Sequence, residues 1–554
     1  MDNIGSIKTI YDLAYSINVS EMLLRKYLNK QNIANCYHSF KIPKRDGTYR
    51  EIFAPENNLK KIQKHINVLL SSHYNINFKE KNQISHAFVK GRSIISNAKV
   101  HKHKKIVLCM DIRNFFDTIN FGRVLGYLRK NKFLLLTKEV SFAIAKIACC
   151  NNKLPQGSPL SPVVSNLIAE NIDYYIAKVS KKYRCDYTRY ADDMVFSTND
   201  IKFKNKIDRF IIEVCDCVLK SGFDINISKT HVMFNNSCQK VTGLVTNNKI
   251  GVQRSYWKKT RAMCYNYFKT GNFFTSNGNG KNEELLGMLS FINQIDKYNN
   301  RLLKKPRNVF NLNVREKIYR DYIFYEKLYN NEKPVIVTEG KTDILYLRAA
   351  ISKSMYMPSE FGRDNGYSFD FETLNVTKSM SFLLGICNDG GSKIKGVYHL
   401  FKPKDSLNLE KIFDNKKYIK SNRPIILLLD NESSKDKPLG QFKNFLNDKS
   451  KNKEIDDNNF VKLDTNGKPV FLLTFPRFSN CDCEIEDLFD KDVLETVIDG
   501  RKFSREDEDK NKFYNKDIFS RYILNNYKRI NFSRFKETLN MLETIILPCA
   551  DGSG

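Results

Sequence analysis

The chain has 554 residues, of which 41% are hydrophobic and 12% aromatic, so it can bury several folded cores. This composition excludes a disordered or collagen-like chain, and the apolar runs fall short of the roughly 20 residues that cross a bilayer. The N-terminus is unlike a signal peptide, and the 13 scattered cysteines lack zinc-site spacing. We therefore expect a cytoplasmic protein with buried, reduced cysteines and no membrane partner.

Positive charge is concentrated in the first three-fifths of the chain. The formal net charge is +30. Residues 1–330 contain 55 basic and 26 acidic side chains, a net charge of +29, whereas residues 331–554 contain 36 and 35, a net charge of +1. Such segregation favours a polyanion-binding module joined to a different domain. The alternative is a lysine-rich composition without a partner.

The first 150 residues predict helices around one basic hairpin. Residues 7–30 have apolar side chains at helical spacing with a polar break, which predicts two short helices. Residues 41–55 alternate apolar and polar side chains about an Asp46-Gly47 turn, as a β-hairpin does. Helical periodicity resumes over residues 59–70 and 121–150.

The next segment predicts a small sheet. Residues 105–110 are a short apolar run that ends at Asp111, and residues 187–197 and 230–234 also have strand patterns. A helix is predicted over residues 160–183. This order of strands and helices predicts an α+β fold with acidic residues at strand ends.

The pattern changes near residue 330. Residues 255–330 are predicted to be helical and are rich in basic side chains, and the string YNNEKP at 329–334 interrupts them. Beyond it, fully apolar segments such as Ile425–Leu429 alternate with helices, as in a parallel α/β sheet. The polar stretch 435–457 is predicted to be a mobile loop. We place a domain boundary near residue 330.

Three acids lie at predicted strand ends. Asp111 follows the run KIVLCM, and Asp192 and Asp193 are adjacent in RYADDMVFS. Neighbouring carboxylates repel one another unless cations are present. Two Mg²⁺ ions about 4 Å apart can activate a 3′ hydroxyl and stabilise an in-line displacement at a triphosphate. The acids therefore favour nucleotidyl transfer, and the alternative is an exposed acidic hairpin.

Four motifs, in a fixed order, resemble the palm of reverse transcriptases. They are DIRNFF at 111–116, LPQGSPL at 154–160, YADD at 190–193 and ISKT at 227–230. The resemblance spans about residues 40–320 and implies a right-hand polymerase with fingers, palm and a helical thumb. It also implies that Asp111, Asp192 and Asp193 are catalytic and bind two Mg²⁺ ions, with dNTPs as substrates.

The same resemblance implies nucleotide-binding residues. Phe116 matches the bulky ring that would clash with a ribose 2′ hydroxyl. Gln156 and Gly157 match a loop near the incoming nucleotide and template, where a missing side chain permits close approach. Lys229 would neutralise pyrophosphate charge. Three basic residues of the hairpin would clamp the triphosphate, and the alternative for them is a solvated basic hairpin: Lys44, Arg45 and Arg50.

Two shorter strings resemble signature elements of bacterial retron reverse transcriptases, which make RNA-linked DNA from a folded noncoding RNA. They are NAKVH from Asn97 to His101, and Val241, Thr242 and Gly243. On a helix, Asn97 and His101 are one turn apart and share a face, so both could contact RNA. The alternative is a helix cap and a core histidine. We predict that these five residues bind the cognate RNA.

Acids also follow two predicted strands of the C-terminal part. Glu339 follows PVIVT. Asp430 follows the apolar run IILLL, and Glu432 comes two residues later. Parallel strands end at one sheet edge, so the three carboxylates are expected to converge on a divalent cation. This part resembles a Toprim domain, although Glu432 stands where the family has Asp. The later string CEIEDLF adds Glu484 or Glu486 as a further metal ligand.

The Toprim resemblance implies metal-dependent cleavage of a nucleic acid, with one or two Mg²⁺ ions. Glu339 would be a general base or a metal ligand, while Asp430 and Glu432 hold the metal against a phosphodiester. The structural alternative is a doubly wound domain whose acids cap helices.

The sequence therefore predicts a retron reverse transcriptase with a fused Toprim-like nuclease effector in antiphage defence. Its partners would be a noncoding RNA and the RNA-linked multicopy single-stranded DNA, with a homo-oligomer left open. The alternatives are a reverse transcriptase of group II intron or diversity-generating type, and a non-catalytic nucleic-acid-binding scaffold. The predicted domains are an N-terminal helical segment (1–40), fingers and palm (41–245), thumb and connector (246–330) and the Toprim-like domain (331–554).

Overall fold

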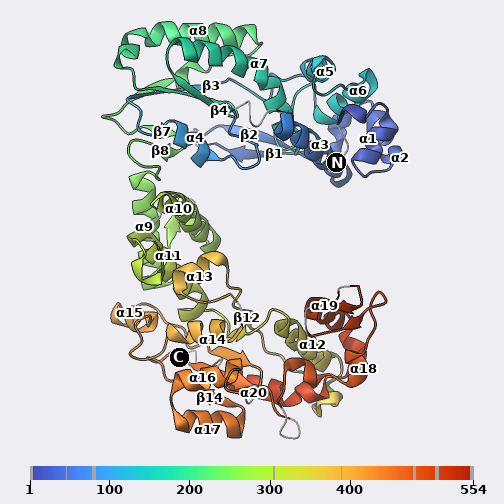
Figure 1. Ribbon diagram of the computed structural model, residues 1–554, viewed down its shortest axis with the longest axis vertical. Coiled ribbons are helices and arrows are strands. Elements are labelled where there is room, and N and C mark those ends of the chain that lie inside the picture. The colour runs from blue at the N-terminus through green and yellow to red at the C-terminus, as the bar shows by residue number, and fades with distance from the viewer. Residues whose placement is uncertain are drawn as a thin grey trace. The chain divides into compact units, whose positions relative to one another are not determined.

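The chain divides into two compact units, shown in a computed structural model (Figure 1). The first unit comprises residues 1–256 and 295–299, and the second comprises residues 257–294 and 300–554. The structure describes residues 4–44, 47–77, 83–276, 278–303, 306–388, 390–432, 434–477, 482–505, 509 and 511–549. Within these ranges, no helix combines the length and apolar character of a membrane-crossing segment.

The first unit is built from helices around a small antiparallel sheet. Its helices are α1 (Ile10–Ser16), α2 (Glu21–Leu28), α3 (Asn57–Asn77), α4 (Ile94–Val100), α5 (Phe121–Lys130), α6 (Lys138–Ala148), α7 (Ser161–Lys182) and α8 (Ile207–Lys220). Its strands are β1 (Tyr37–Pro43), β2 (Tyr49–Pro55), β3 (Ile106–Asp111), β4 (Asp186–Tyr190), β5 (Asp193–Thr198), β6 (His231–Phe234), β7 (Lys240–Val241) and β8 (Leu244–Val245).

The central sheet has the strand order β4-β5-β3-β6, with every neighbouring pair antiparallel. Helices α7 and α8 cover one face (Figure 1). On that face the ring of Phe210 in α8 meets the ring of Phe196 in β5 edge-on, with centroids 5.0 Å apart. Helix α4 packs against β4. The predicted α+β arrangement of this region is confirmed.

The local predictions for the N-terminal part largely hold. Helix α1 begins at a capping box formed by Thr9, and α2 begins after Ser20, whose side chain accepts a hydrogen bond from the amide of Leu23. Strands β1 and β2 form the predicted hairpin. The helix predicted over 121–150 is instead two helices, because Asn131 ends α5 and Thr137 caps the start of α6.

The second unit contains a helical part followed by an α/β part. Its helices are α9 (Arg254–Thr270), α10 (Asn282–Leu302), α11 (Val314–Phe324), α12 (Asp343–Tyr356), α13 (Lys378–Leu384), α14 (Gly390–His399), α15 (Leu409–Asn415), α16 (Pro438–Leu446), α17 (Lys449–Asn458), α18 (Lys491–Leu494), α19 (Lys516–Asn526) and α20 (Lys536–Ile546). Its strands are β9 (Phe274–Thr275), β10 (Gly278–Asn279), β11 (Val335–Thr338), β12 (Glu372–Thr373), β13 (Ile425–Leu429), β14 (Phe460–Lys462), β15 (Val470–Thr474), β16 (Lys502–Phe503) and β17 (Phe513–Tyr514).

The main sheet of this unit has the order β12-β11-β13-β15-β14, and only β14 runs antiparallel. Its two faces belong to different hydrophobic cores. Ile336 of β11 packs in one core with residues of α12, whereas Val335 and Val337 pack in the other with residues of α14. Burial on both faces explains why β11, β13 and β15 are almost entirely apolar, and the predicted parallel α/β sheet is confirmed.

The prediction of a mobile loop over 435–457 is wrong. This stretch forms α16 and α17, which are polar on most sides but bury Leu439, Phe442 and Ile455. Asp448 caps α17 by accepting hydrogen bonds from the amides of Ser450 and Lys451. A few apolar contacts and one cap are therefore enough to order a lysine-rich segment.

The domain boundary predicted near residue 330 does not coincide with the division between the compact units. One hydrophobic core runs through this point, because aromatic side chains before it pack on others after it. The ring of Phe413 lies 5.8 Å from that of Phe268 and 6.2 Å from that of Tyr325, and Phe324 lies 5.4 Å from Phe401. Helices α9 and α11 thus belong to the core of the second unit.

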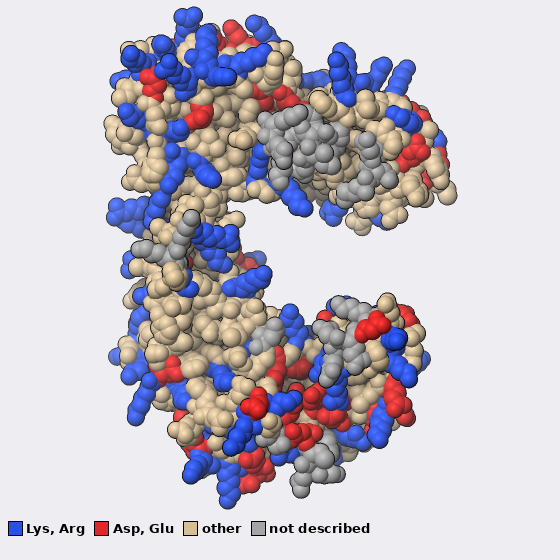
Figure 2. Space-filling view, viewed as in Figure 1, with Lys and Arg blue, Asp and Glu red and all other residues tan. Residues whose placement is uncertain are grey.

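This division also changes how charge is distributed. The first unit has 42 basic and 21 acidic side chains, a net charge of +21, and the second has 49 and 40, a net charge of +9. Figure 2 shows Lys and Arg across the visible face of the first unit, and a mixture with Asp and Glu on the second. Both units are therefore net basic, the first more strongly.

Candidate active sites

The first site lies at one end of the sheet of the first unit. Strand β3 ends at Asp111, which pairs directly with Asp193, the first residue of β5. Asp192 lies in the turn just before, and its carbonyl accepts a hydrogen bond of 3.0 Å from the amide of Ile112. Ala191 turns the chain with φ of 57°. Strand register and one tight turn thus bring the three predicted catalytic acids to the same place.

The crowded acids at this site favour cation binding. The pKa of Asp193 is raised to about 6, first by desolvation and then by the charges of Asp192 and Asp111. Desolvation also raises the pKa of Asp192. The ammonium of Lys229 lies 3.1 and 3.2 Å from the two carboxylate oxygens of Asp111. Lys229, predicted to face pyrophosphate, here pairs with Asp111, one of the predicted catalytic acids.

The donor chemistry fits Mg²⁺, although the side chains are not preassembled. Nowhere in the described ranges do three or more His, Cys, Asp or Glu side chains form a metal-binding group. The three acids supply hard oxygen ligands at one strand end, as Mg²⁺ requires. Because the ammonium of Lys229 contacts both oxygens of Asp111, a bound metal ion would compete with it for that carboxylate.

A buried ion pair supports the turn that holds Asp192. Arg189 of β4 is completely buried, and its guanidinium donates two hydrogen bonds of 2.8 Å to the carboxylate of Asp173 in α7. It also donates to the carbonyl of Ala191, at 3.0 Å, and to Asn166. The arginine therefore ties the turn that holds Asp192 to the helix behind the sheet.

The loop with Gln156 and Gly157 packs on the hairpin of β1 and β2. The amide of Phe53 in β2 donates a hydrogen bond of 2.7 Å to the carbonyl of Gln156. Gly157 has φ of 118°, and a Cβ there would lie 2.7 Å from the carbonyl oxygen of Phe53 and 2.8 Å from Ile52. The close approach that requires glycine is thus made by β2. Contact of these residues with nucleotide or template stays a prediction.

The other predicted nucleotide-binding residues are placed as follows. Phe116 is half-buried, with its ring edge-on to Phe115 at 5.4 Å and to Phe88 at 6.5 Å. Arg50 is exposed, and its charge opposes the rise in the pKa of Asp192. Lys44 is exposed beside the hairpin turn, and Arg45 lies outside the described residues.

The structure contradicts direct RNA contact by three residues of the retron-like strings. Asn97, His101 and Val241 are completely buried. The ring nitrogens of His101 lie 2.7 Å from the hydroxyl of Ser197 and 2.6 Å from that of Thr188, which in turn donates to Asn97. Burial lowers the pKa of His101 to about 3, so the ring is neutral.

Asn97, His101 and Val241 of these strings therefore lie in the interior of the first unit. Asn97 lies 3.5 Å from the hydroxyl of Thr242, in the turn between β7 and β8, so the two strings contact each other. Thr242 is half-buried and Gly243 is exposed. RNA contact remains a prediction for this turn alone.

The second site lies at the carboxyl ends of β11 and β13. These strands pair in parallel, so Glu339 and Asp430, which follow them, are neighbours. The amide of Asp430 donates a hydrogen bond of 3.3 Å to the carboxylate of Glu339. The amide of Ile485 donates to the carboxylate of Asp430 at 3.1 Å, which brings Glu484 and Glu486 to the same edge.

The acids of the second site influence one another strongly. The pKa of Asp430 is raised well above its usual value by burial and by the charges of Asp343, Glu339, Glu486 and Glu484. Desolvation raises the pKa of Glu339 to about 7, and the charge of Glu432 contributes. Carboxyls held in this way favour a bound cation or a proton.

Basic side chains form ion pairs with several acids of the second site. The ammonium of Lys516 lies 3.4 Å from Glu484 and 3.1 Å from the buried Glu486. Arg505 lies 3.3 Å from Glu484. Glu432 pairs with Lys437 at 2.6 Å. The predicted acids thus come to one edge, with Glu432 turned toward a lysine, and their oxygen donors again suit Mg²⁺.

Sequence comparisons place the first half of the chain near reverse transcriptases. Residues 42–259 match the family model "Reverse transcriptase (RNA-dependent DNA polymerase)". The chain is 30% identical to the Retron Mx65 reverse transcriptase of Myxococcus xanthus over 275 residues, covering 47% of this chain and 62% of that protein. It is 29% identical to the Retron Ec86 reverse transcriptase of Escherichia coli over 305 residues, covering 54% and 88%.

Solved structures give a weaker likeness. A telomerase from Candida albicans, in complex with a fragment of telomeric RNA, aligns with a TM-score of 0.31 and 12% identity, covering 56% of this chain and 62% of that one. Apo telomerase from Candida tropicalis also gives a TM-score of 0.31, covering 46% and 50%.

Several residues of both sites escaped the sequence-based prediction. Arg189 could have been suspected, since it is a charged residue inside a strand directly before the YADD motif. Asp343 follows Glu339 within one turn, which is a weaker signal. Lys516 and Arg505 have no local motif, because they reach the acids only through the fold of the last 70 residues.

Proposed function

We propose that the first unit is a Mg²⁺-dependent, RNA-directed DNA polymerase of retron type. It would copy a noncoding RNA into RNA-linked multicopy single-stranded DNA, using dNTPs. The observation that carries this proposal is the direct pairing of Asp111 with Asp193 beside Asp192. The matched family model and the relatives, which are named as retron reverse transcriptases, support it over an intron-type enzyme.

In this mechanism Asp111, Asp192 and Asp193 would hold the metal, which would supply Lewis acid chemistry at the triphosphate and the 3′ hydroxyl. Lys229 would offer its charge to the pyrophosphate. Arg189 keeps the turn in place.

The polymerase proposal predicts that single neutral substitutions stop synthesis. Asp192→Asn and Asp193→Asn each remove a metal ligand with little change of shape, so cDNA synthesis on the cognate RNA should fall by at least about a hundredfold. The measurement is primer extension by the full-length protein. Asp216→Asn, an exposed acid of α8, is the matched control and should keep full activity. Undiminished synthesis by both active-site variants would overturn the assignment.

We infer that the second unit is a Toprim-like, metal-dependent nuclease. Its acids lie between β11 and β13. From β11 the chain first adds β12 on one side and then β13 on the other, so the sheet grows in opposite directions from this point. Open α/β sheets bind their ligands at such switch points. Burial and mutual repulsion of Glu339 and Asp430 support a role in binding a divalent cation there.

The nuclease proposal predicts a separable loss of function. Glu339→Gln and Asp430→Asn should abolish Mg²⁺-dependent cleavage of DNA or RNA while cDNA synthesis continues. Cleavage by the full chain is followed on gels, with Asp457→Asn in α17 as an exposed control. If both variants cut as fast as the control, the acids are not the nuclease site.

The two activities together suggest antiphage defence, with the RNA-linked DNA restraining the nuclease. Phage plaque counts on bacteria that express the protein test this role. Protection should disappear with Asp193→Asn or with Glu339→Gln, and protection that survives both changes would exclude it.

A further inference from the structure

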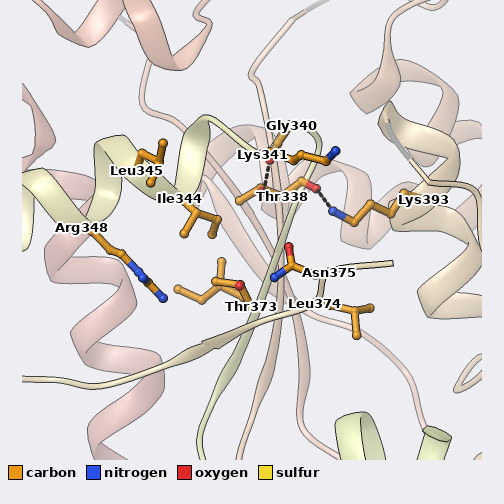
Figure 3. Close-up of a pocket in the computed structure, with 11 residues that line it drawn as sticks. Thr338, Gly340, Lys341, Ile344, Leu345, Arg348, Thr373, Leu374, Asn375 and Lys393 are labelled. Atoms are coloured by element: carbon orange, nitrogen blue, oxygen red, sulfur yellow. Dashed lines mark hydrogen bonds between the residues drawn. The ribbon is translucent and has the colours of Figure 1, made fainter. Parts of the chain in front are cut away.

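A cationic cavity lies beside the second site, on the other side of β11. It has a volume of about 220 Å³ and is lined from β11, the start of α12, the β12 segment and α14 (Figure 3). Strands β12 and β13 flank β11 on opposite sides, and the cavity is lined by a residue of β12 but by none of β13. None of the predicted metal-binding acids lines it.

The lining residues include three cations and no acid. Lys341 and Arg348 are exposed, and neither forms an ion pair with another described residue. Lys393 is 6% exposed, and its ammonium donates a hydrogen bond of 2.9 Å to the carbonyl of Thr338. In Figure 3, Arg348 extends toward Thr373 and Lys393 toward Thr338. The lining side chains therefore carry a net positive charge.

Neutral groups add to this character. The first turn of the 14-residue helix α12 contributes Ile344 and Leu345 to the lining. Its N-cap residue, Thr342, makes no side-chain cap hydrogen bond, and the carboxylate of Asp343 in the first turn accepts hydrogen bonds from the amide of Gly340 and the hydroxyl of Thr342. The exposed amide of Asn375 supplies a further donor.

We propose that this cavity binds a phosphate group of a nucleotide, either a free mononucleotide or one phosphate of a nucleic-acid strand. Three cations match a doubly charged oxyanion better than a carboxylate. The volume is below the roughly 300–1,000 Å³ of sites that enclose a whole cofactor, which suits a phosphate with part of its sugar. The inference depends on the cavity alone and holds whether or not the neighbouring acids cleave.

Binding here would also place a strand beside Glu339, since Thr338 and Gly340 line the cavity and flank that residue in sequence. A phosphate held by the cations would leave the adjoining sugar-phosphate bonds near the carboxylates of the second site.

The test uses the full-length protein in EDTA, so that no metal held by the acids can bind the probe. Three probes are titrated: inorganic phosphate, a deoxynucleoside 5′-monophosphate and a short single-stranded DNA. The variant Lys341→Ala/Arg348→Ala removes two exposed cations. Lys411→Ala/Lys453→Ala removes two exposed charges elsewhere in the second unit and is the matched control. Lys393→Met tests the buried cation, with thermal melting to verify folding.

The pocket variant should bind at least one probe about tenfold or more weakly than the control. Loss of phosphate and mononucleotide binding identifies a free nucleotide as the ligand. Loss restricted to the DNA identifies a strand phosphate. Equal affinities of the pocket variant and the control for all three probes overturn the proposal. If the probes bind in EDTA but no cleavage follows when Mg²⁺ is added, the proposed nuclease activity is wrong and the proposed phosphate site still holds.

Discussion

A single carboxyl makes the stability of the first unit depend on pH. Burial raises the pKa of Glu170 in α7 to about 7, although the hydroxyl of Tyr127 donates a 2.6 Å hydrogen bond to one of its oxygens. Its other oxygen has no hydrogen-bond partner among the described residues. The unfolded pKa is about 4.3, so between this value and 7 only the folded state holds the proton. Stability contributed by this group is therefore lost as the pH rises through 7.

Replacing Glu170 with Gln should remove this loss. We expect Glu170→Gln to stabilise the protein by about 2 kcal/mol more at about pH 8 than at about pH 5, because the wild-type carboxyl is ionised only at the higher pH. Unfolding followed by circular dichroism at the two pH values measures the difference. Asp216→Asn should show none, and an equal gain at both pH values would disprove the linkage.

At the scale of elements, the contact of the 154–160 loop with β2 has a sharp steric requirement. Gly157→Ala places a methyl group against the carbonyl of Phe53 and forces alanine to a positive φ. We expect a destabilisation of about 1–3 kcal/mol and weaker cDNA synthesis, since the loop and the hairpin shift together. Gly126→Ala, within α5 and with free space around it, should be neutral or stabilising by about 1 kcal/mol. If Gly157→Ala and Gly126→Ala have the same melting temperature and the same activity, the packing argument is wrong.

Elements whose signals are local could be predicted from the sequence. The hairpin turn, the capped helices and the fully apolar strands all follow from residues that are close in the chain. The acids converge as expected because strand ends meet at sheet edges. What failed depends on distant contacts: the polar segment 435–457 is helical because of three buried apolar side chains, and His101 is buried because β4 and β5 cover it.

At the scale of the molecule, exposed lysines outside the first unit should contribute to RNA binding. Lys258 and Lys259 are exposed on α9. Replacing both with Gln should weaken binding of the cognate RNA and flatten its dependence on salt by about 0.7–0.9 per lost phosphate contact. Fluorescence anisotropy over a range of KCl concentrations measures the slope. Lys449→Gln/Lys453→Gln in α17 is the control, and identical slopes for both pairs would exclude α9 from the RNA-binding surface.

The aromatic core that α9 and α11 share with the α/β layer limits where the protein can be divided into fragments that fold separately. A stop codon at residue 330 would leave Phe268, Phe324 and Tyr325 without the rings they pack on, and a fragment starting there would expose Phe413 to water. Either fragment should aggregate and be degraded rapidly in the cell. Separate expression of the two units would succeed only if the downstream fragment also contains the helices from residue 257 onward.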